Sequence, residues 1–151
     1  MKSTFADILK PLEAEKFAKL TIEAGNVFRV NMDKADGVTP KQGDSSRNKY
    51  FVVLGFDGAG SAYGGVIFNS RINQNLAPSV RDYHMPVSRA KYGFLSHDSF
   101  VDCSSLKTAN PAKLLKGQYL GDVDEDDLSL IKSTVKSSPK ETEERLALFG
   151  L

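Results

Sequence analysis

Two strand-length apolar runs, separated by a short glycine-containing turn, constrain the fold of this chain more than any other feature. Residues 50–56 read YFVVLGF and residues 62–68 read AYGGVIF. The intervening DGAG favours a turn, so the pair predicts an antiparallel hairpin. The first run is almost continuously apolar, which is typical of a strand covered on both faces. Gly64 and Gly65 in the second run predict a bulge or a sharp bend, of the sort that a small barrel needs.

Weaker patterns on both sides of this hairpin predict the other elements of the fold. Apolar residues alternate along 26–32, which indicates a half-buried strand. Short strands are expected over 83–87, 99–103 and 118–120. Helical spacing predicts a helix over 124–137, with Asp124 as its N-cap and acidic residues in its first turn. Several short strands with helices at the ends predict a mainly-β fold, a small and strongly bent β-barrel with helical additions.

Helix signals also occur at both ends of the chain, outside the expected barrel. Apolar spacing over 4–24 predicts N-terminal helix, interrupted at Pro11. The sequence Ser-Pro-Lys-Glu from Ser138 predicts a capped helix that runs to Phe149. Because no linker or repeat is visible, we expect a single domain. Its parts are an N-terminal helical extension (1–24), a barrel core (25–137) and a C-terminal helical extension (138–151).

Composition argues against several classes of protein. No apolar run is long enough to cross a bilayer, and no secretory signal is visible at the N-terminus, so we expect no membrane association. Cys103 is the only cysteine, which fits a reducing cytoplasm, and its apolar neighbours predict a core position. No cluster of histidine, cysteine and carboxylate has metal-ligand spacing, so we expect no metal and no cofactor.

Positive charge concentrates in the middle of the sequence although the net charge is only +1. Residues 37–97 hold seven basic and three acidic side chains, whereas residues 98–151 hold seven basic and ten acidic ones. The segment 33–48 has no periodicity and, as an expected loop of sixteen residues, is long enough to indicate a functional role. From Gly37 onward, the basic residues of this segment and of the position that follows it are Lys41, Arg47 and Lys49.

Small polar side chains follow directly where the second apolar run ends. These are Asn69, Ser70 and Arg71. A cationic loop that faces a cluster of hydrogen-bonding side chains suits a phosphodiester ligand. The sequence therefore favours a nucleic-acid site at this end of the hairpin, although charge alone fits a solvated surface equally well.

The order of five segments resembles the PemK/MazF-like toxin family over about residues 25–137. They read GNVFRVNM, NKYFVVLGF, YGGVIFNSRIN, SFVDCSSLKT and QYLGDVDEDDLSLIKSTVKSS. The resemblance implies an SH3-like barrel of the PemK/CcdB type, with a long loop between its first two strands and a helix after the barrel. It also implies a homodimeric, metal-independent and sequence-selective endoribonuclease that cuts single-stranded RNA (an mRNA interferase). Its other partner would be the antitoxin of a type II toxin–antitoxin pair.

The residues implied by the resemblance depart from the family pattern at two places. The family arginine before the VVL strand falls on Lys49, with Arg47 two residues earlier. The family threonine or serine falls on Asn69 or Ser70. The Asp-Gln pair of a later DQLRT segment falls on Ser104 and Ser105, so that acid is absent and Asp102 is the nearest carboxylate.

From this correspondence we expect Arg47, Lys49 and Ser70 to be catalytic. The residues expected to bind RNA are Lys41, Asn69, Arg71, His84, Ser104 and Ser105. The general base stays open among His84, His97, Asp98 and Asp102. Two alternatives also stay open: a catalytically silent barrel that binds RNA or protein, and a CcdB-like toxin that acts on a protein target.

Overall fold

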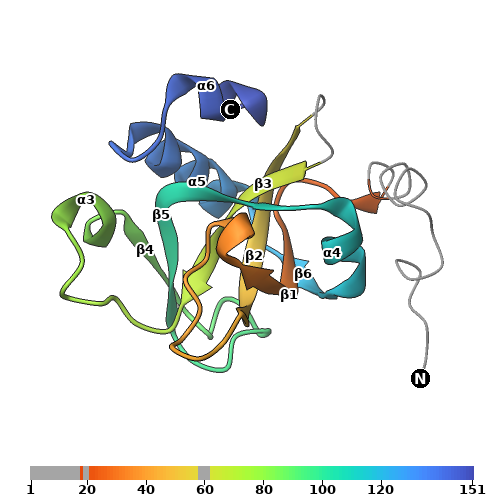
Figure 1. The fold of residues 1–151 in the computed structure, drawn as a ribbon, viewed down its shortest axis with the longest axis horizontal. Coiled ribbons are helices and arrows are strands. Elements are labelled where there is room, and N and C mark those ends of the chain that lie inside the picture. Colours follow the sequence, from red (N-terminus) through yellow and green to blue (C-terminus); the bar gives the residue numbers. More distant parts are fainter. Residues whose placement is uncertain (1–17, 19–20, 58–61) are drawn as a thin grey trace.

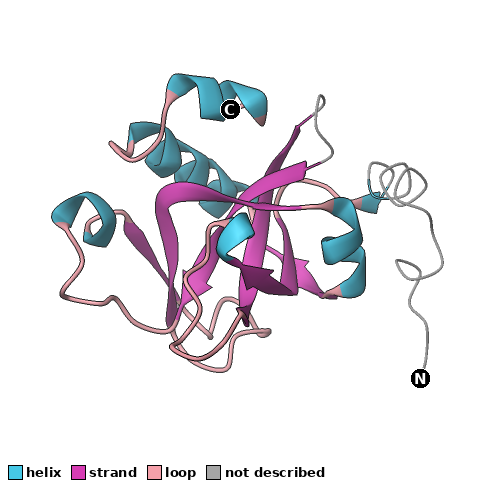
Figure 2. Ribbon diagram, in the orientation of Figure 1, coloured by secondary structure: helices cyan, strands magenta, loops and turns pink. Residues whose placement is uncertain are grey.

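The computed structural model describes residues 18, 21–57 and 62–151, and these residues form an antiparallel sheet with helices packed around it (Figures 1 and 2). The strands are β1 (Asn26–Asp33), β2 (Ser46–Asp57), β3 (Ala62–Asn69), β4 (His84–Val87), β5 (Ser99–Ala109) and β6 (Gln118–Asp122). The helices are η1 (Lys34–Asp36), α3 (Pro78–Arg81), α4 (Pro111–Lys116), α5 (Glu125–Ser137) and α6 (Glu143–Leu148). Most of the expected N-terminal helix, over 4–24, lies outside the described residues.

The strand order β4-β5-β3-β2-β1-β6 confirms the mainly-β fold, but the sheet is not a closed barrel. β2 and β3 pair as the predicted hairpin, and the pairing of β3 with β5 shifts between Gly65 and Ile67, at the position of the predicted bulge. Within the described residues, the edge strands β4 and β6 do not pair with each other. Both strands are short, and Pro86 in β4 has no N–H to donate to another strand.

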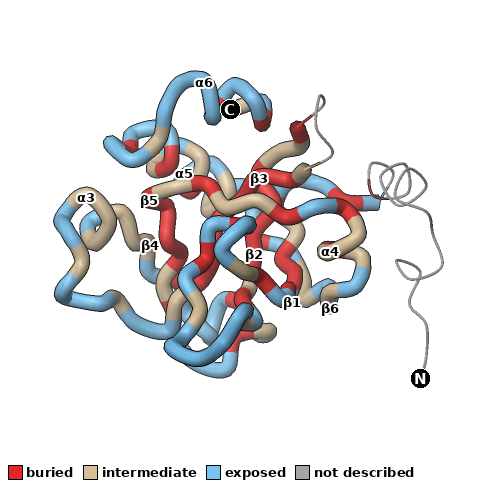
Figure 3. Tube along the Cα trace, viewed as in Figure 1, coloured by how far each residue is buried: buried red, intermediate tan, exposed pale blue. Residues whose placement is uncertain are grey.

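Two hydrophobic clusters cover the two faces of β2, which explains its continuous apolar sequence. Val52 and Leu54 pack with residues of α5 and α6, whereas Phe51 and Val53 pack with the opposite cluster, which includes Leu114 of α4. Successive side chains of a strand point to opposite faces, so one apolar run serves both clusters. Figure 3 shows buried residues along the middle of the sheet and mostly exposed residues along α6.

The predicted start of α5 and the predicted core position of Cys103 are both confirmed. The Asp124 carboxylate accepts a hydrogen bond from the Asp127 N–H at 2.8 Å and caps the helix. Asp124 and Asp127 also form ion pairs with Lys91, at 2.7 and 2.9 Å. Cys103 is fully buried in the cluster under α5.

Three boundaries differ from the sequence prediction, and each changes the description of the site. β2 begins at Ser46, so Arg47 and Lys49 lie in a strand rather than in or beside a loop. β5 continues past Cys103 to Ala109 and bends along its length (Figure 1). α6 begins after Thr142, not at Ser138.

The C-terminal extension, residues 138–151, packs on the sheet of its own chain. The ring of Phe149 lies against Gly64, where a side-chain Cβ, if one were present, would be 2.6 Å from the ring carbon Cγ. A Cβ on Gly55 would likewise collide with the backbone of Phe149. Ser138 donates a hydrogen bond to the carbonyl oxygen of Ser104, which draws this residue to β5 instead of into a helix. Across the described part of the chain, no helix is both long and apolar enough to span a membrane.

Candidate functional site

A cleft of about 860 Å³ lies where β2, β3 and β5 end or bend, between the segment after η1 and the C-terminal extension. Its apolar surface comes from residues such as Val38, Ile67 and Leu106. Among the described residues, the cationic side chains that line it are Arg47, Lys49, Lys107, Lys140 and Arg145. The carboxylates in the lining are Asp102 and Glu141. The excess of cations suits an anionic ligand.

Lys49 is the most buried cation of this cleft. It continues the row of Phe51 and Val53 on one face of β2, and only 9% of its surface is exposed. Its Nζ donates a hydrogen bond to Oδ1 of Asn69 on β3 at 2.7 Å. Burial, followed by repulsion from Arg47, lowers the pKa of Lys49 to about 8, while attraction to Asp102 partly opposes this change. Lys49 therefore loses its proton much more readily than an ordinary lysine.

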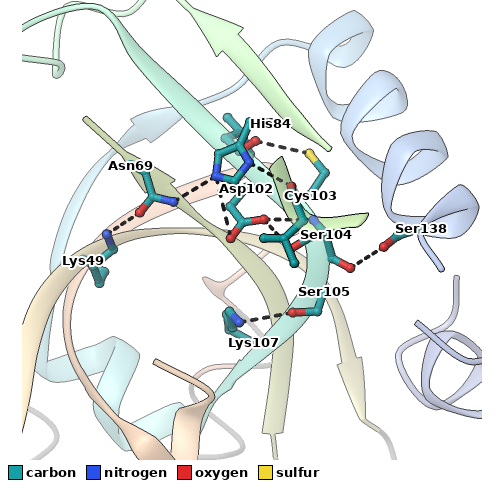
Figure 4. A network of polar contacts seen from close by, with 11 residues as sticks. Lys49, Asn69, His84, Asp102, Cys103, Ser104, Ser105, Lys107 and Ser138 are labelled. Carbon is teal, nitrogen blue, oxygen red and sulfur yellow. Dashed lines mark hydrogen bonds and ion pairs between the residues drawn. The ribbon is translucent and has the colours of Figure 1, made fainter. Parts of the chain in front are cut away.

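Behind Lys49, a chain of hydrogen bonds fixes the position of Asn69 (Figure 4). The Nδ2 atom of Asn69 lies 3.2 Å from Nε2 of His84, and Nδ1 of His84 lies 3.0 Å from the carbonyl oxygen of Val80. Because a carbonyl only accepts, Nδ1 carries the ring proton and Nε2 accepts from the amide of Asn69. This tautomer leaves Oδ1 of Asn69 free to accept from Lys49, so the bonds are mutually consistent.

Asp102 joins the same network from β5. Its Oδ1 accepts hydrogen bonds from Oγ of Ser104 at 2.6 Å and from the Ser104 N–H at 3.0 Å. Its Oδ2 lies 3.9 Å from Nε2 of His84. The carboxylate is nearly buried, and these bonds together with the charge of Lys49 compensate for its loss of water. A carboxylate is thus present in the cleft, two residues before Ser104 on β5.

The structure brings five of the expected site residues to this cleft. They are Arg47, Lys49, Asn69, Ser104 and Ser105. Lys107 follows on β5 and donates to Oγ of Ser105 at 3.1 Å. The side chain of His84 has no exposed surface, so it can act on a ligand only through Asn69.

Three expected residues lie elsewhere. Ser70 is exposed in an adjoining smaller pocket, which it shares with Lys49, Asn69 and His97. Lys41 and Arg71 are exposed and do not line the cleft. The expected residues therefore do not all lie in one cluster. Those that line the cleft gather around the Lys49–Asn69 pair.

Sequence reasoning missed the cations that β5 and the C-terminal extension supply. Lys107 falls outside the strand predicted over 99–103, because the apolar signal of β5 stops near Cys103. The alternation of Ser105 and Lys107 is the pattern that could have extended the strand. Lys140 and Arg145 come from a segment far away in the sequence, and no local pattern indicates that they reach the cleft.

The described residues contain no group of three or more histidine, cysteine, aspartate or glutamate side chains that could hold a metal ion. The chemistry available in the cleft is that of ammonium and guanidinium groups, side-chain amides, hydroxyls and carboxylates. These groups can bind a phosphodiester, orient it and stabilise negative charge that develops on it.

Comparison with known proteins shows a likeness of fold. The sequence matches no protein-family model, and no curated protein matches it. Among solved structures, the chain is similar to a chain of a MazE–MazF complex from Deinococcus radiodurans. The TM-score is 0.53 at 15% sequence identity, over 76% of this chain and 92% of that chain. The fold is therefore similar to the MazF fold, and the activity has to be argued from the site.

Proposed function

We propose that this protein is a metal-independent, sequence-selective endoribonuclease that cleaves single-stranded RNA in the cleft around Lys49. The observation that carries the proposal is the buried Lys49, fixed on Asn69 and flanked by Arg47 and Lys107. A cation held in one position, with a lowered pKa, suits both the binding of a phosphodiester and proton transfer. The likeness to the MazF fold supports the same class of activity.

In the proposed reaction, the RNA supplies its own nucleophile. The neutral form of Lys49 takes the proton of the 2′-hydroxyl, and O2′ attacks the adjacent phosphorus. The bond from phosphorus to O5′ breaks, and O5′ takes a proton from water. The hydroxide that remains takes the proton from Lys49, which returns to its neutral form. The products carry a 2′,3′-cyclic phosphate and a 5′-hydroxyl. Arg47 and Lys107 stabilise the additional negative charge of the transition state, and Asn69 holds Lys49 in place.

The proposal includes the biological setting of a toxin–antitoxin pair. The similar solved structure is a complex of MazE with MazF, and by that likeness we propose a homodimer restrained by an antitoxin protein. An acidic or extended segment of such a partner would cover the cationic cleft, because the same side chains that attract phosphates attract carboxylates.

The test is incubation of purified protein with a mixed-sequence single-stranded RNA in EDTA. We expect fragments that end in 2′,3′-cyclic phosphate, and loss of cleavage in Lys49→Met, which keeps most of the side-chain volume but has no ammonium group. Lys136→Gln, an exposed charge change on α5, is the matched control and should cleave like the wild type. Intact RNA at high protein excess would contradict the nuclease.

A second candidate function is RNA binding without cleavage. The observation that favours it is that the side chain of His84 is fully buried with both ring nitrogens in hydrogen bonds, so it is not free to act as a base. If Lys49 remains protonated on bound RNA, the cleft binds and does not cut. The same experiment separates the two functions, since salt-sensitive binding with intact RNA supports the silent site.

A further inference from the structure

The C-terminal extension forms one wall of the cleft and is attached to β5 by a specific clasp. Oε2 of Glu141 accepts from the Leu106 N–H at 2.6 Å, and Oε1 accepts from Nε of Arg145 at 2.9 Å. Nη2 of Arg145 donates to the carbonyl oxygen of Leu106 at 2.9 Å. The side chain of Glu141 is only 1% exposed. The clasp therefore holds Arg145 in one orientation beside the middle of β5.

The clasp leaves most of the Arg145 guanidinium available to a ligand. An arginine has five N–H donors, and the two bonds above use two of them. The side chain is 49% exposed and lines the cleft together with Lys140, which is also exposed. Glu141 offsets part of the Arg145 charge through the ion pair at Nε, but its other oxygen is bound to the Leu106 N–H, so the remaining guanidinium donors stay open to an incoming anion. The wall thus presents two cations to the cleft.

Lys140 and Arg145 belong to the C-terminal extension, so they lie on a different wall of the cleft from Lys49 on β2. Asp102 belongs to the Lys49 network, whereas Arg145 is attached four residues later, at Leu106. Four residues of extended strand span at most about 13 Å. The two places are therefore close enough for one RNA strand of a few nucleotides to reach both, and the cleft of about 860 Å³ is larger than a single phosphodiester group needs.

We propose that Lys140 and Arg145 form a second phosphate-binding position in the cleft, for a phosphate of the same single-stranded RNA away from the one held at Lys49. This inference rests on the proposed RNA-binding function. The C-terminal extension then has a role in substrate binding in addition to its packing on the sheet. It makes the affinity depend on RNA length, because only a longer strand contacts both positions.

The test measures binding of an end-labelled single-stranded RNA of about 12 nucleotides by fluorescence anisotropy at several salt concentrations. The variants are Lys140→Gln, which leaves the clasp intact, and Arg145→Gln. Lys136→Gln is the control, since it removes a nearby exposed charge that does not line the cleft. Each of these variants is made in the Lys49→Met background, so that any cleavage of the RNA is suppressed. Thermal unfolding of each variant is recorded.

Each lost phosphate contact should make the negative slope of log affinity against log salt shallower by about 0.7. At about 0.1 M salt this corresponds to about a fivefold loss of affinity. We expect this change for Lys140→Gln and Arg145→Gln with the long RNA, and none with a dinucleotide. Unchanged affinity and slope in both variants, while the Lys49→Met parent binds the RNA, would overturn the second position. Absence of RNA binding by both the parent and the unmodified wild type would overturn the proposed function itself.

Discussion

Lys49 and Asn69 join neighbouring strands by a hydrogen bond of 2.7 Å between a nearly buried ammonium group and an amide oxygen. The bond lies at the end of the hairpin on which the whole sheet is built, so the fold itself sets the geometry of the pair. On the side of Asn69 away from Lys49, His84 fixes the amide through its Nε2 atom. The centre of the proposed site is thus prepared before any ligand arrives.

The lowered pKa of Lys49 predicts that stability depends on pH. In the unfolded chain this lysine has its usual pKa of 10.5, whereas in the folded chain the pKa is about 8. Between these values the unfolded state binds more protons, so the free energy of unfolding should rise with pH across this window. Urea denaturation of the wild type and of Lys49→Met, followed from pH 8 to 10.5, measures the difference. The same pH dependence in both proteins would contradict the burial of a titrating Lys49.

Substitution of Asn69 should reduce cleavage more than substitution of Ser70. Asn69 binds Lys49 and lines the main cleft, whereas Ser70 lies in the adjoining pocket. Without the amide, Lys49 can adopt other positions, and misplacement of a catalytic group reduces rates by about 100-fold. Single-turnover cleavage by Asn69→Ala and Ser70→Ala compares the two residues. A larger loss in Ser70→Ala would show that the serine, and not the asparagine, is the more important of the two for cleavage.

The sequence predicts the strands of this fold well because their signal is local. The hairpin over residues 50–68, the strand from Asn26 and the helix capped by Asp124 depend on alternation, turn residues and capping, all of which occur within a few positions. The start of β2 at Ser46 could not be predicted in this way. Ser46 and its polar neighbours are strand residues because they pair with the end of β1, and hydropathy does not report pairing.

Only part of the candidate site could be predicted from the sequence, because some of its residues are brought together by contacts between distant segments. Arg47, Lys49 and Asn69 lie beside the apolar runs of the hairpin, so their strands place them together. Arg145 reaches the cleft only because Phe149 packs on glycines of β2 and β3 and Glu141 binds β5. Those contacts join positions distant in the sequence, and nothing in the local pattern indicates them. The capping signal at Ser138 is overridden by its bond to the Ser104 carbonyl.

Cys103 should be unreactive in the folded protein. It is fully buried, and burial followed by the charge of Asp102 raises the pKa of its thiol to about 12. The thiolate, which is the reactive form, is therefore rare at neutral pH. We expect iodoacetamide at pH 8 to label the protein only in denaturant. Rapid labelling without denaturant, at a rate similar to that of a free thiol, would mean that β5 opens readily.

The contact of Phe149 with Gly64 predicts that these residues are coupled in stability. A Cβ in Gly64→Ala would lie 2.6 Å from Cγ of the ring, so the ring must move, with an expected loss of about 1–3 kcal/mol. Phe149→Ala removes a buried aromatic ring and should reduce stability by about 3–5 kcal/mol. In the double variant the Phe149 ring is absent, so the new Cβ has nothing to clash with. The loss of stability should therefore be smaller than the sum of the two single losses.

Urea denaturation of the four proteins in this cycle measures the coupling between Gly64 and Phe149. Gly93→Ala is the control, because a Cβ there has no neighbouring atom within 4 Å and its stability should hardly change. Additive losses would mean that the extension does not rest on the glycine in solution. If the coupling is found, Gly64→Ala should also weaken RNA binding at the position formed by Lys140 and Arg145, since the displaced ring carries the C-terminal extension with it.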